Sequence, residues 1–377
     1  MRFIQKKIID FVNESKGKKN IYCFGAGIAL IRFLHRFQEY NLEDDIKYVV
    51  DNSKAKQGTM VQGINKKLLI ISPEQMLHEI TSKDIILITT IYYPEIVELL
   101  NKEEQLKNTE CYLYYALMIE QYDCDRLNIA VPEKLSIYQN QRIPKVIHYC
   151  WFGGRPIPEL YRHWMKSWEQ YCPDYEIIEW NERNYDVRKN KYVHQAYEMG
   201  KWAFVSDYAR IDIIHEYGGV YLDTDVELIK NIDEMLMNDG FCGFETSDYV
   251  NYGLGFGARK HHAIVSAIKE YYDNLCFVSE DGTLNQVNCP IIQTEIMKKH
   301  GLVCNGEFQL VEGMTVYPSK TLCGMSPHSF RIQNHLGDTY AIHHYSGSWI
   351  ENVQGKQNII SYIKKWSRDD NYFYPDL

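Results

Sequence analysis

Short apolar runs alternate with amphipathic stretches over the first third of the chain. Residues 20–24 and 46–50 have the length and composition of buried strands, and residues 28–40 place apolar side chains at helical spacing. Further strands are expected at residues 84–89 and 111–115, and further helices begin at Ser72 and Pro94. Strands that alternate with helices predict an α/β domain with a Rossmann-like, doubly wound parallel sheet, which we place at residues 1–120.

The pattern changes after this region. Residues 121–142 show little periodicity and are interpreted as a linker. A second α/β domain is expected at residues 143–377, with a strand at 145–151 and a long helix at 193–217. Gly218-Gly219 ends that helix, because glycine adopts the left-handed turn found at helix C-termini, and a short strand follows at once.

The charge balance and the cysteines narrow the class of protein. Forty-one Lys and Arg against 50 Asp and Glu give a net charge of -9, so the positive field that nucleic-acid binding needs is missing, and we expect no nucleic-acid partner. The longest uncharged apolar run, residues 21–31, is far shorter than the ~20 residues that span a bilayer. Residues 1–19 contain no signal-peptide pattern, and ten cysteines occur without a C-x-x-C pair, as in proteins with reduced thiols. We therefore expect a cytoplasmic protein.

Gly25-Ala26-Gly27 follows the first strand and precedes a helix, as the start of a dinucleotide-binding fingerprint does. Leu30 stands where the complete pattern has its third glycine, although Asp51 after the second strand could accept a hydrogen bond from a ribose hydroxyl. A structural turn and a nucleotide site are both consistent with this pattern. An oxidoreductase or epimerase would also need a catalytic Tyr-x-x-x-Lys, which the sequence of residues 20–117 lacks.

Two Asp-x-Asp patterns differ in their surroundings. Asp123-Cys124-Asp125 lies in the expected linker, where both carboxylates are interpreted as solvated. Asp223-Thr224-Asp225 follows a strand, so both carboxylates would lie at the carboxyl edge of a sheet, where α/β folds bind ligands. Two carboxylates provide half of a site for a hard cation such as Mg²⁺ or Mn²⁺, which completes its shell with water and phosphate oxygens. Without suitable neighbours they would be two ordinary turn residues.

Two further groups of polar residues are candidate neighbours. Asp207 and Arg210 are three residues apart on the helix before this strand, hence on one face, where they form either part of a pocket or an ordinary surface ion pair. The segment AIHHYSGSW, residues 341–349, contains His343 and His344. Either one of them is a metal ligand or both are plain strand residues.

Three blocks in this half of the chain resemble the DXD glycosyltransferases of family 32. They are KVIHYCWFGG (residues 145–154), VSDYARIDIIHEYGGVYLDTDVEL (205–228) and AIHHYSGSW (341–349), in the order and spacing of that family. The family includes capsular polysaccharide enzymes and yeast-type mannosyltransferases, and the blocks are more distantly similar to the glucosylating domain of large clostridial toxins. The resemblance covers residues 143–350 and implies a GT-A-like catalytic domain. Residues 20–117 resemble more loosely a nucleotide-sugar-epimerase-like domain that is often fused to capsular glycosyltransferases.

The resemblance also implies a role for each matching residue. Asp225 would ligate a divalent metal, Mn²⁺ or Mg²⁺, and Asp223 would contact the ribose, or the metal through water. A His followed by an aromatic residue, any residue and Gly supplies a further ligand in related enzymes, and His344, rather than His343, fits that register. The implied catalytic set is Asp207, Arg210, Asp223 and Asp225, and the implied donor-binding set is Trp151 on the base, Asp207, Arg210 and Tyr221 at the sugar, and Ser348 and Trp349 over the diphosphate.

These observations predict a metal-dependent glycosyltransferase that moves a hexose from a nucleotide-diphosphate sugar to a glycan or lipid-linked oligosaccharide. The expected donor is a UDP-sugar such as UDP-galactose, UDP-glucose or UDP-GlcNAc. The resemblance implies retention of the anomeric configuration, by front-face attack or through a covalent intermediate. It also implies a role in capsular or surface polysaccharide synthesis, with a peripheral association at the inner membrane face. Two alternatives are an oxidoreductase or epimerase that acts through the N-terminal domain, and a catalytically silent sugar-binding protein.

Overall fold

The computed structural model describes residues 1–346 except 5, 91, 281, 286, 328–331 and 333–335, and only the backbone of residues 120–125 and 127. The described chain forms two compact units, Met1–Cys124 and a second that begins at Asp125. Each unit has its own sheet and its own hydrophobic core.

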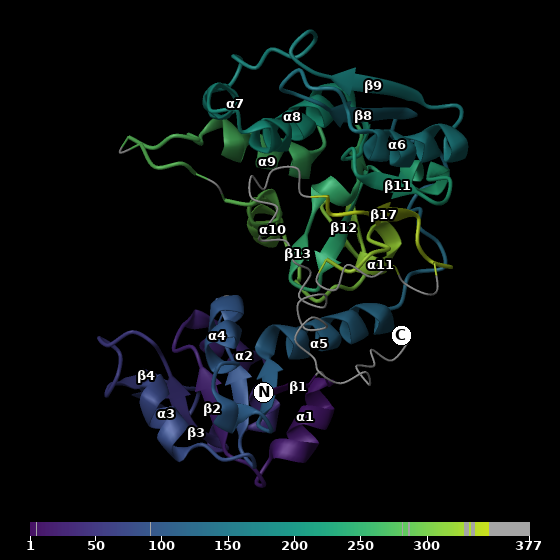
Figure 1. Cartoon of the computed structure of the whole chain (residues 1–377). Coiled ribbons are helices and arrows are strands. Elements are labelled where there is room, and N and C mark those ends of the chain that lie inside the picture. The colour runs from purple at the N-terminus through teal and green to yellow at the C-terminus, as the bar shows by residue number, and fades with distance from the viewer. Residues whose placement is uncertain are drawn as a thin grey trace. The chain divides into compact units, whose positions relative to one another are not determined.

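A seven-stranded sheet forms the centre of the first unit (Figure 1). Its strand order is β1-β7-β6-β2-β3-β5-β4, and all neighbours are parallel except β4 and β5. Side chains that alternate along β2 enter two hydrophobic clusters, which α1 and α2 complete on one face and α3 and α4 on the other. The strands are β1 (Arg2–Phe3), β2 (Ile21–Phe24), β3 (Ile46–Val50), β4 (Met60–Gln62), β5 (Lys67–Ile71), β6 (Ile85–Ile88) and β7 (Glu110–Leu113), and the helices are α1 (Ile8–Ser15), α2 (Ile28–Arg36), α3 (Pro73–Glu79), α4 (Tyr93–Leu100) and α5 (Tyr114–Asn128).

The glycine turn of the first unit is tied to Asp51. Gly25 has a φ of +123°, and a Cβ there would lie 2.9 Å from the carbonyl oxygen that follows β6, so only glycine fits. One carboxylate oxygen of Asp51 accepts from the Ala26 amide at 3.1 Å and from Lys56 at 2.9 Å. The other accepts from the Ser53 amide at 2.9 Å. Because both oxygens of Asp51 already bind this chain's own donors, the arrangement favours the structural turn over the nucleotide site.

Helix α5 extends through residues 121–128, where the sequence pattern predicts a linker. The structure differs because no Gly or Pro interrupts the helix, so nothing local ends it before Asn128. The irregular segment that follows belongs to the second unit. Leu135 is buried in that core, and its carbonyl oxygen accepts from the Tyr317 hydroxyl at 2.5 Å.

An eight-stranded mixed sheet forms the centre of the second unit. Its main order is β9-β8-β10-β14-β12-β16-β15, and β13 pairs with β12. Strands β8, β9 and β10 are parallel, β14 runs antiparallel between β10 and β12, and β12 is parallel to β16. Two successive reversals make β10 and β12 run in the same direction, so all five parallel strands end at one edge of the sheet.

The strands of this unit are β8 (Val146–Cys150), β9 (Glu176–Trp180), β10 (Gly219–Tyr221), β11 (Val226–Leu228), β12 (Gly240–Thr246), β13 (Tyr249–Val250), β14 (Phe256–Ala258), β15 (Gln309–Val311), β16 (Met314–Tyr317) and β17 (Ala341–His343). Its helices are α6 (Glu159–Tyr171), α7 (Lys191–Glu198), α8 (Trp202–Tyr217), α9 (Ala263–Asp273), α10 (Cys289–Lys299) and α11 (Ser319–Leu322). Strands β11 and β17 form a separate two-stranded sheet.

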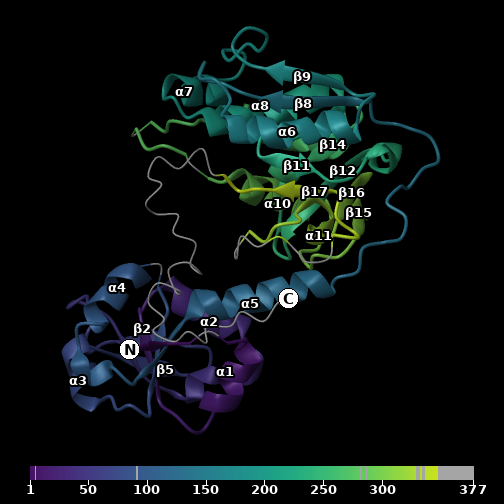
Figure 2. The ribbon, with the colours of Figure 1, turned by 45° about the vertical axis from the view of Figure 1, so that its right-hand side comes forward.

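Helices cover both faces of the main sheet. Helices α7 to α10 share one hydrophobic cluster, and α6, α11 and the β11–β17 pair share another; Figure 2 shows α6 in front of the sheet. The α/β class predicted from the sequence is thereby confirmed, and the mixed sheet is consistent with a GT-A-like fold. In the described part of the chain, no helix combines the length and the apolar character needed to cross a membrane.

A buried histidine supports the turn that leads from α8 into β10. His148 accepts from the Trp180 indole N–H at Nδ1, at 3.1 Å, and donates from Nε2 to the Gly218 carbonyl oxygen at 2.9 Å. Gly219 has a φ of +106°, and a Cβ there would lie 2.9 Å from the same Nε2. Burial lowers the pKa of His148 to about 4. The turn therefore depends on a neutral His148.

We expect acid to destabilise the second unit through His148. The unfolded chain binds a proton near the ordinary histidine pKa of about 6.5, whereas the folded chain resists protonation down to about 4. Stability should therefore fall as the pH drops between these values, by up to about 1.4 kcal/mol per pH unit. His148→Gln, which can still donate to Gly218, should lack this slope. Urea unfolding at a series of pH values, followed by tryptophan fluorescence, measures it, since no tryptophan precedes Trp151; equal slopes in both proteins would contradict the expectation.

Candidate active site

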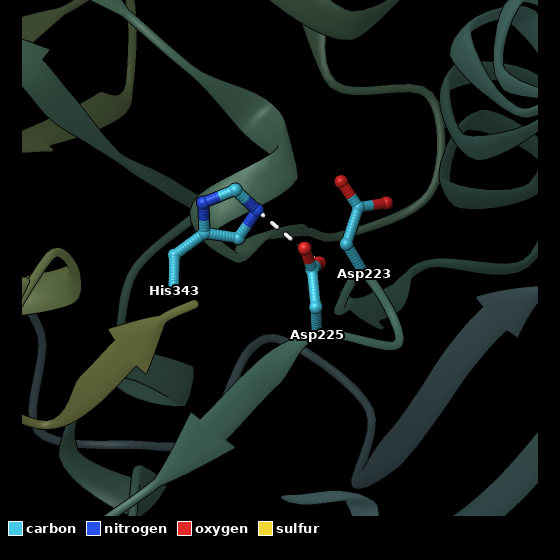
Figure 3. Close-up of side chains that lie close together, drawn as sticks. All are labelled: Asp223, Asp225 and His343. Atoms are coloured by element: carbon cyan, nitrogen blue, oxygen red, sulfur yellow. Dashed lines mark ion pairs between the residues drawn. The ribbon is translucent and has the colours of Figure 1, made fainter. Parts of the chain in front are cut away.

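The Asp223-Thr224-Asp225 motif lies between β10 and β11, at the edge where the parallel strands of the second unit end. Strand β17 pairs with β11 in an antiparallel register that places His343 opposite Val226. One ligand atom each from Asp223, Asp225 and His343 lie within 4.8 Å of one another, and Figure 3 shows the imidazole directed at Asp225. The structure thus joins side chains from two distant segments in one cluster.

Asp225 is the most strongly partnered member of the cluster. Its Oδ1 lies 3.3 Å from His343 Nε2, and its Oδ2 accepts from the Ser346 amide at 2.9 Å and the Ser346 hydroxyl at 2.7 Å. Burial alone would raise the pKa of Asp225, but His343 and the Ser346 hydrogen bonds outweigh burial and hold this pKa well below its ordinary value. Asp225 in turn raises the pKa of His343 against the effect of burial. The contact therefore favours the charged form of both groups.

Asp223 lies between this pair and a buried arginine. Its Oδ1 accepts from the Tyr221 hydroxyl at 3.0 Å and lies 3.2 Å from the Arg210 guanidinium. Arg210 also lies over the Tyr221 ring, 5.0 Å from its centroid. Burial raises the pKa of Asp223, Arg210 opposes this effect, and the charge of Asp225 adds to it. Asp223 is therefore a carboxylate held in place by its own chain.

Arg210 also binds Asp207, one turn earlier on α8, at 3.1 Å. The two residues share a helix face, as their spacing predicts. They are only 7% and 4% exposed, so this is a buried pair and not an ordinary surface one. Burial raises the pKa of Asp207, and Arg210 counteracts this rise. Cys289, the first residue of α10, places its sulfur 3.9 Å from Arg210 Nη1 and completes the surroundings of the guanidinium.

The cluster fits a divalent cation. Carboxylate oxygens are the preferred ligands of Mg²⁺ and Mn²⁺, and an imidazole nitrogen suits a transition metal such as Mn²⁺. The second ring nitrogen of His343, Nδ1, is buried and has no hydrogen-bond partner among the described residues. The polar contacts described for this ring therefore all lie on the side of the carboxylates. Asp225 and His343 would hold the cation directly, with Asp223 beside them.

His344, which the resemblance suggests as the third ligand, faces away from this cluster. Its Nε2 lies 2.8 Å from Glu227, and its ring stacks on Trp164 at a centroid distance of 4.1 Å and an angle of 7°. Glu227 lies opposite Ile342, and side chains two apart share a face, so His344 lies on the side of Glu227. Asp225 precedes β11, which begins at Val226, and its carboxylate contacts His343 instead. The structure therefore brings His343, and not the expected His344, to the two aspartates.

The two histidines should respond oppositely to alanine substitution. His343→Ala should raise the Mn²⁺ concentration for half-maximal turnover by about tenfold or more, because a candidate ligand is lost. His344→Ala should leave that concentration unchanged and lower stability by about 1 kcal/mol, because the Trp164 stack is lost. Metal titrations and melting curves of both variants measure this, and a changed metal requirement in His344→Ala alone would contradict the register.

Trp151 follows β8 directly and lies at the same edge of the sheet. Its indole nitrogen donates to the Arg155 carbonyl oxygen at 2.5 Å, and its ring meets Tyr161 edge to face at 6.0 Å. Within the described contacts, none joins Trp151 to the acidic cluster. Ser348 and Trp349, the other expected donor-binding residues, lie outside the described residues.

Three residues at the site were not found from the sequence. Gly253 leaves room for the Asp223 carboxylate, because a Cβ at this position would lie 2.5 Å from Asp223 Oδ2 and 3.2 Å from Arg210 Nη1. Asn251 fixes this glycine by accepting from its amide at 2.7 Å. No spacing rule marks either residue. Ser346 lies in the segment that contains the histidines, but its hydrogen bonds to Asp225 join residues 121 apart in the sequence.

Comparison with protein families matches residues 158–242 to the family described as "Glycosyltransferase sugar-binding region containing DXD motif". The matched segment includes Asp207, Arg210, Asp223 and Asp225. It ends within β12, and His343, the member of the cluster on β17, lies outside it.

Two curated yeast proteins are similar to part of the chain. Inositol phosphoceramide mannosyltransferase 3 of Schizosaccharomyces pombe is 31% identical over 125 residues, which cover 30% of this chain and 34% of that protein. Mannosyl phosphorylinositol ceramide synthase SUR1 of Saccharomyces cerevisiae is 30% identical over 148 residues, 37% of each chain. The matches therefore span little more than a third of the length of these relatives. Together with the family match they support a transferase of glycosyl groups.

Among solved structures, "PaToxG Glycosyltransferase" aligns with a TM-score of 0.32 and 12% sequence identity, covering 49% of this chain and 76% of that one.

Proposed function

We propose that this chain is a metal-dependent glycosyltransferase that transfers a hexose from a nucleotide-diphosphate sugar to a glycan or lipid-linked acceptor. The observation that carries the proposal is the convergence of Asp223, Asp225 and His343 at the carboxyl edge of the sheet. A buried cation, Arg210, lies beside them. The match to a DXD-motif glycosyltransferase family supports the transferase part of the proposal.

The surroundings of each charged side chain suit a particular role in donor cleavage. A divalent cation held by Asp225 and His343 would stabilise the negative charge that develops on the diphosphate when its bond to the sugar breaks. Arg210 stays charged although burial opposes its charge, because Asp223 and Asp207 lie against it and raise its pKa. Asp207 and Asp223 can accept hydrogen bonds from donor hydroxyl groups. Since these groups are held by their own chain before the donor binds, little reorganisation accompanies the reaction.

The donor is proposed to be a UDP-hexose such as UDP-glucose, UDP-galactose or UDP-GlcNAc. The position of Trp151 at the same sheet edge supports a base stacked on its ring, and the resemblance to family 32 implies retention of the anomeric configuration. The names of the two yeast relatives contain a mannosyl group, which favours a mannosyl donor as the second candidate.

The acceptor is proposed to be a lipid-linked oligosaccharide used in capsular or surface polysaccharide synthesis. The names of the yeast relatives also contain a ceramide lipid, in keeping with a lipid-borne acceptor. A water-soluble donor and a lipid-linked acceptor meet at a membrane surface. We therefore propose that the protein works from the cytoplasm in peripheral association with the inner membrane face.

A panel of UDP- and GDP-sugars tests the proposal. The purified full chain should release the nucleotide diphosphate from one of them in the presence of Mn²⁺, and a chelator should stop the release. Asp225→Asn serves as the inactive control. Reduction of a nicotinamide cofactor without cleavage of any donor would favour the oxidoreductase. Donor binding without cleavage at any metal concentration would favour a silent sugar-binding protein.

A further inference from the structure

We propose a second metal site on the surface of the second unit, formed by His215 and His261, for a transition-metal ion such as Zn²⁺. His215 lies in the last turn of α8, and His261 lies in the turn between β14 and α9. Neither residue takes part in the Asp223-Asp225-His343 cluster. The site is therefore independent of the proposed transferase activity.

The spacing of the two rings matches a pair of metal ligands. Nε2 of His215 and Nδ1 of His261 are 3.4 Å apart, and the rings are inclined at 76°. Two nitrogens on a tetrahedral Zn²⁺, each at about 2.0–2.1 Å from the metal, are separated by about 3.3–3.4 Å. The same two nitrogens are also within hydrogen-bond distance, so a bound ion would take the place of a direct contact between them.

Glu216 orients His215 as a metal ligand. Its carboxylate lies 2.9 Å from His215 Nδ1, so that ring nitrogen carries the proton and donates it to Glu216. Nε2 is then left with its lone pair on the side of His261. Metal-binding histidines commonly donate their other ring N–H to a carboxylate, which fixes the tautomer and raises the basicity of the ligand nitrogen.

The main chain fixes His261 relative to His215. The His261 amide donates to the His215 carbonyl oxygen at 3.0 Å, and His261 has a φ of +54°, a left-handed conformation that His adopts more readily than most residues. His261 is exposed and the His215 side chain is 18% exposed, so water can complete the coordination. Two imidazole nitrogens without a carboxylate ligand select Zn²⁺, Ni²⁺ or Cu²⁺ over Mg²⁺. A bound ion would fasten the end of α8 to the turn before α9.

Titration of the full chain with Zn²⁺ tests this site. Asp225→Asn removes one carboxylate of the other cluster, and calorimetry of that variant should show one equivalent of bound Zn²⁺. Adding His261→Asn, which keeps a residue suited to the left-handed turn, should weaken Zn²⁺ binding by about 100-fold or more. Glu216→Gln should weaken it by about tenfold, because the ligand remains and only its orienting partner is lost.

His300→Asn is the matched control. His300 pairs with Glu312 at 3.1 Å, and the described contacts bring no second imidazole to it. In the Asp225→Asn background, Zn²⁺ binding should therefore be unchanged by His300→Asn, and Zn²⁺ should raise the melting temperature of this variant but not that of the one with His261→Asn. If Asp225→Asn does not fold, the same comparison in the wild-type background should show one equivalent fewer for His261→Asn. No Zn²⁺ binding at all, equal binding in His261→Asn, or an equal loss in His300→Asn would overturn the proposal, whatever the outcome of the donor panel.

Discussion

Asp225→Asn should lower metal-dependent donor cleavage by about 10³-fold or more while the protein stays folded. Asn fills the same volume, and its amide oxygen can still accept a hydrogen bond from Ser346. It lacks the negative charge of the carboxylate that contacts His343 and would bind the cation. A 10³-fold loss corresponds to about 4 kcal/mol of transition-state stabilisation, which is within the range supplied by a metal at a developing diphosphate. Initial rates at saturating donor over a range of Mn²⁺ concentrations measure the loss, and circular dichroism checks the fold.

Glu227→Gln is the matched control for this experiment. Glu227 lies on β11, two residues after Asp225, and its carboxylate faces His344 instead of the cluster. The same change from carboxylate to amide should therefore leave the rate and the Mn²⁺ dependence within about twofold of the wild type. Normal turnover in Asp225→Asn, or an equal loss in Glu227→Gln, would remove Asp225 from the candidate metal site.

The parts of the site that follow from local spacing could be predicted from the sequence. Asp207 and Arg210 share a face because a helix brings residues three apart together. Asp223 and Asp225 lie at the sheet edge because they follow a strand directly, and parallel strands end at a common edge. In both cases the arrangement follows from residues that are close together in the sequence.

The parts that depend on long-range pairing could not be predicted. Ser346 donates to Asp225 across a separation of 121 residues. His343 ends β17 and His344 follows it, and the contacts of each depend on how this segment meets β11 and Asp225. A motif specifies spacing along one segment but not this long-range pairing, so it does not tell which of the two histidines reaches Asp225. Gly253 could not be predicted either, because its role depends on the distant Asp223 carboxylate for which it leaves room.

Helix α5 is a second case in which the sequence pattern did not predict the local structure. The residues before Asn128 have weak periodicity, which is typical of a linker, yet the backbone there is helical. Weak periodicity reports that a segment lacks one well-defined buried face, and it does not report the conformation of the main chain. Helix-ending residues are the better signal for such a boundary, and none occurs within α5.

Arg210→Met should destabilise the second unit by about 3–5 kcal/mol and abolish donor cleavage. Methionine has a similar length and no charge, so Asp207 and Asp223 would remain buried without a cation, which is the costly way to break a buried ion pair. Arg210→Lys should lose less, because it keeps a positive charge but cannot contact both carboxylates with one planar group. Urea unfolding followed by tryptophan fluorescence measures both variants. Arg142→Met is the surface control, since Arg142 is 42% exposed in its pair with Asp239 and should contribute little to stability.

The pH dependence of Arg210→Met separates lost charge compensation from lost packing. Burial already raises the pKa values of Asp207 and Asp223, and Arg210 opposes this rise, so removing Arg210 should raise both pKa values further. Folded carboxylates with pKa values above those of the unfolded chain bind protons more tightly when folded. The loss in free energy of unfolding relative to the wild type should therefore be largest near neutral pH. It should shrink as the pH falls through the raised pKa values of the two carboxyl groups. A deficit that stays constant with pH would mean that Arg210 acts through packing alone, and the site would then lack the buried charge on which its proposed chemistry depends.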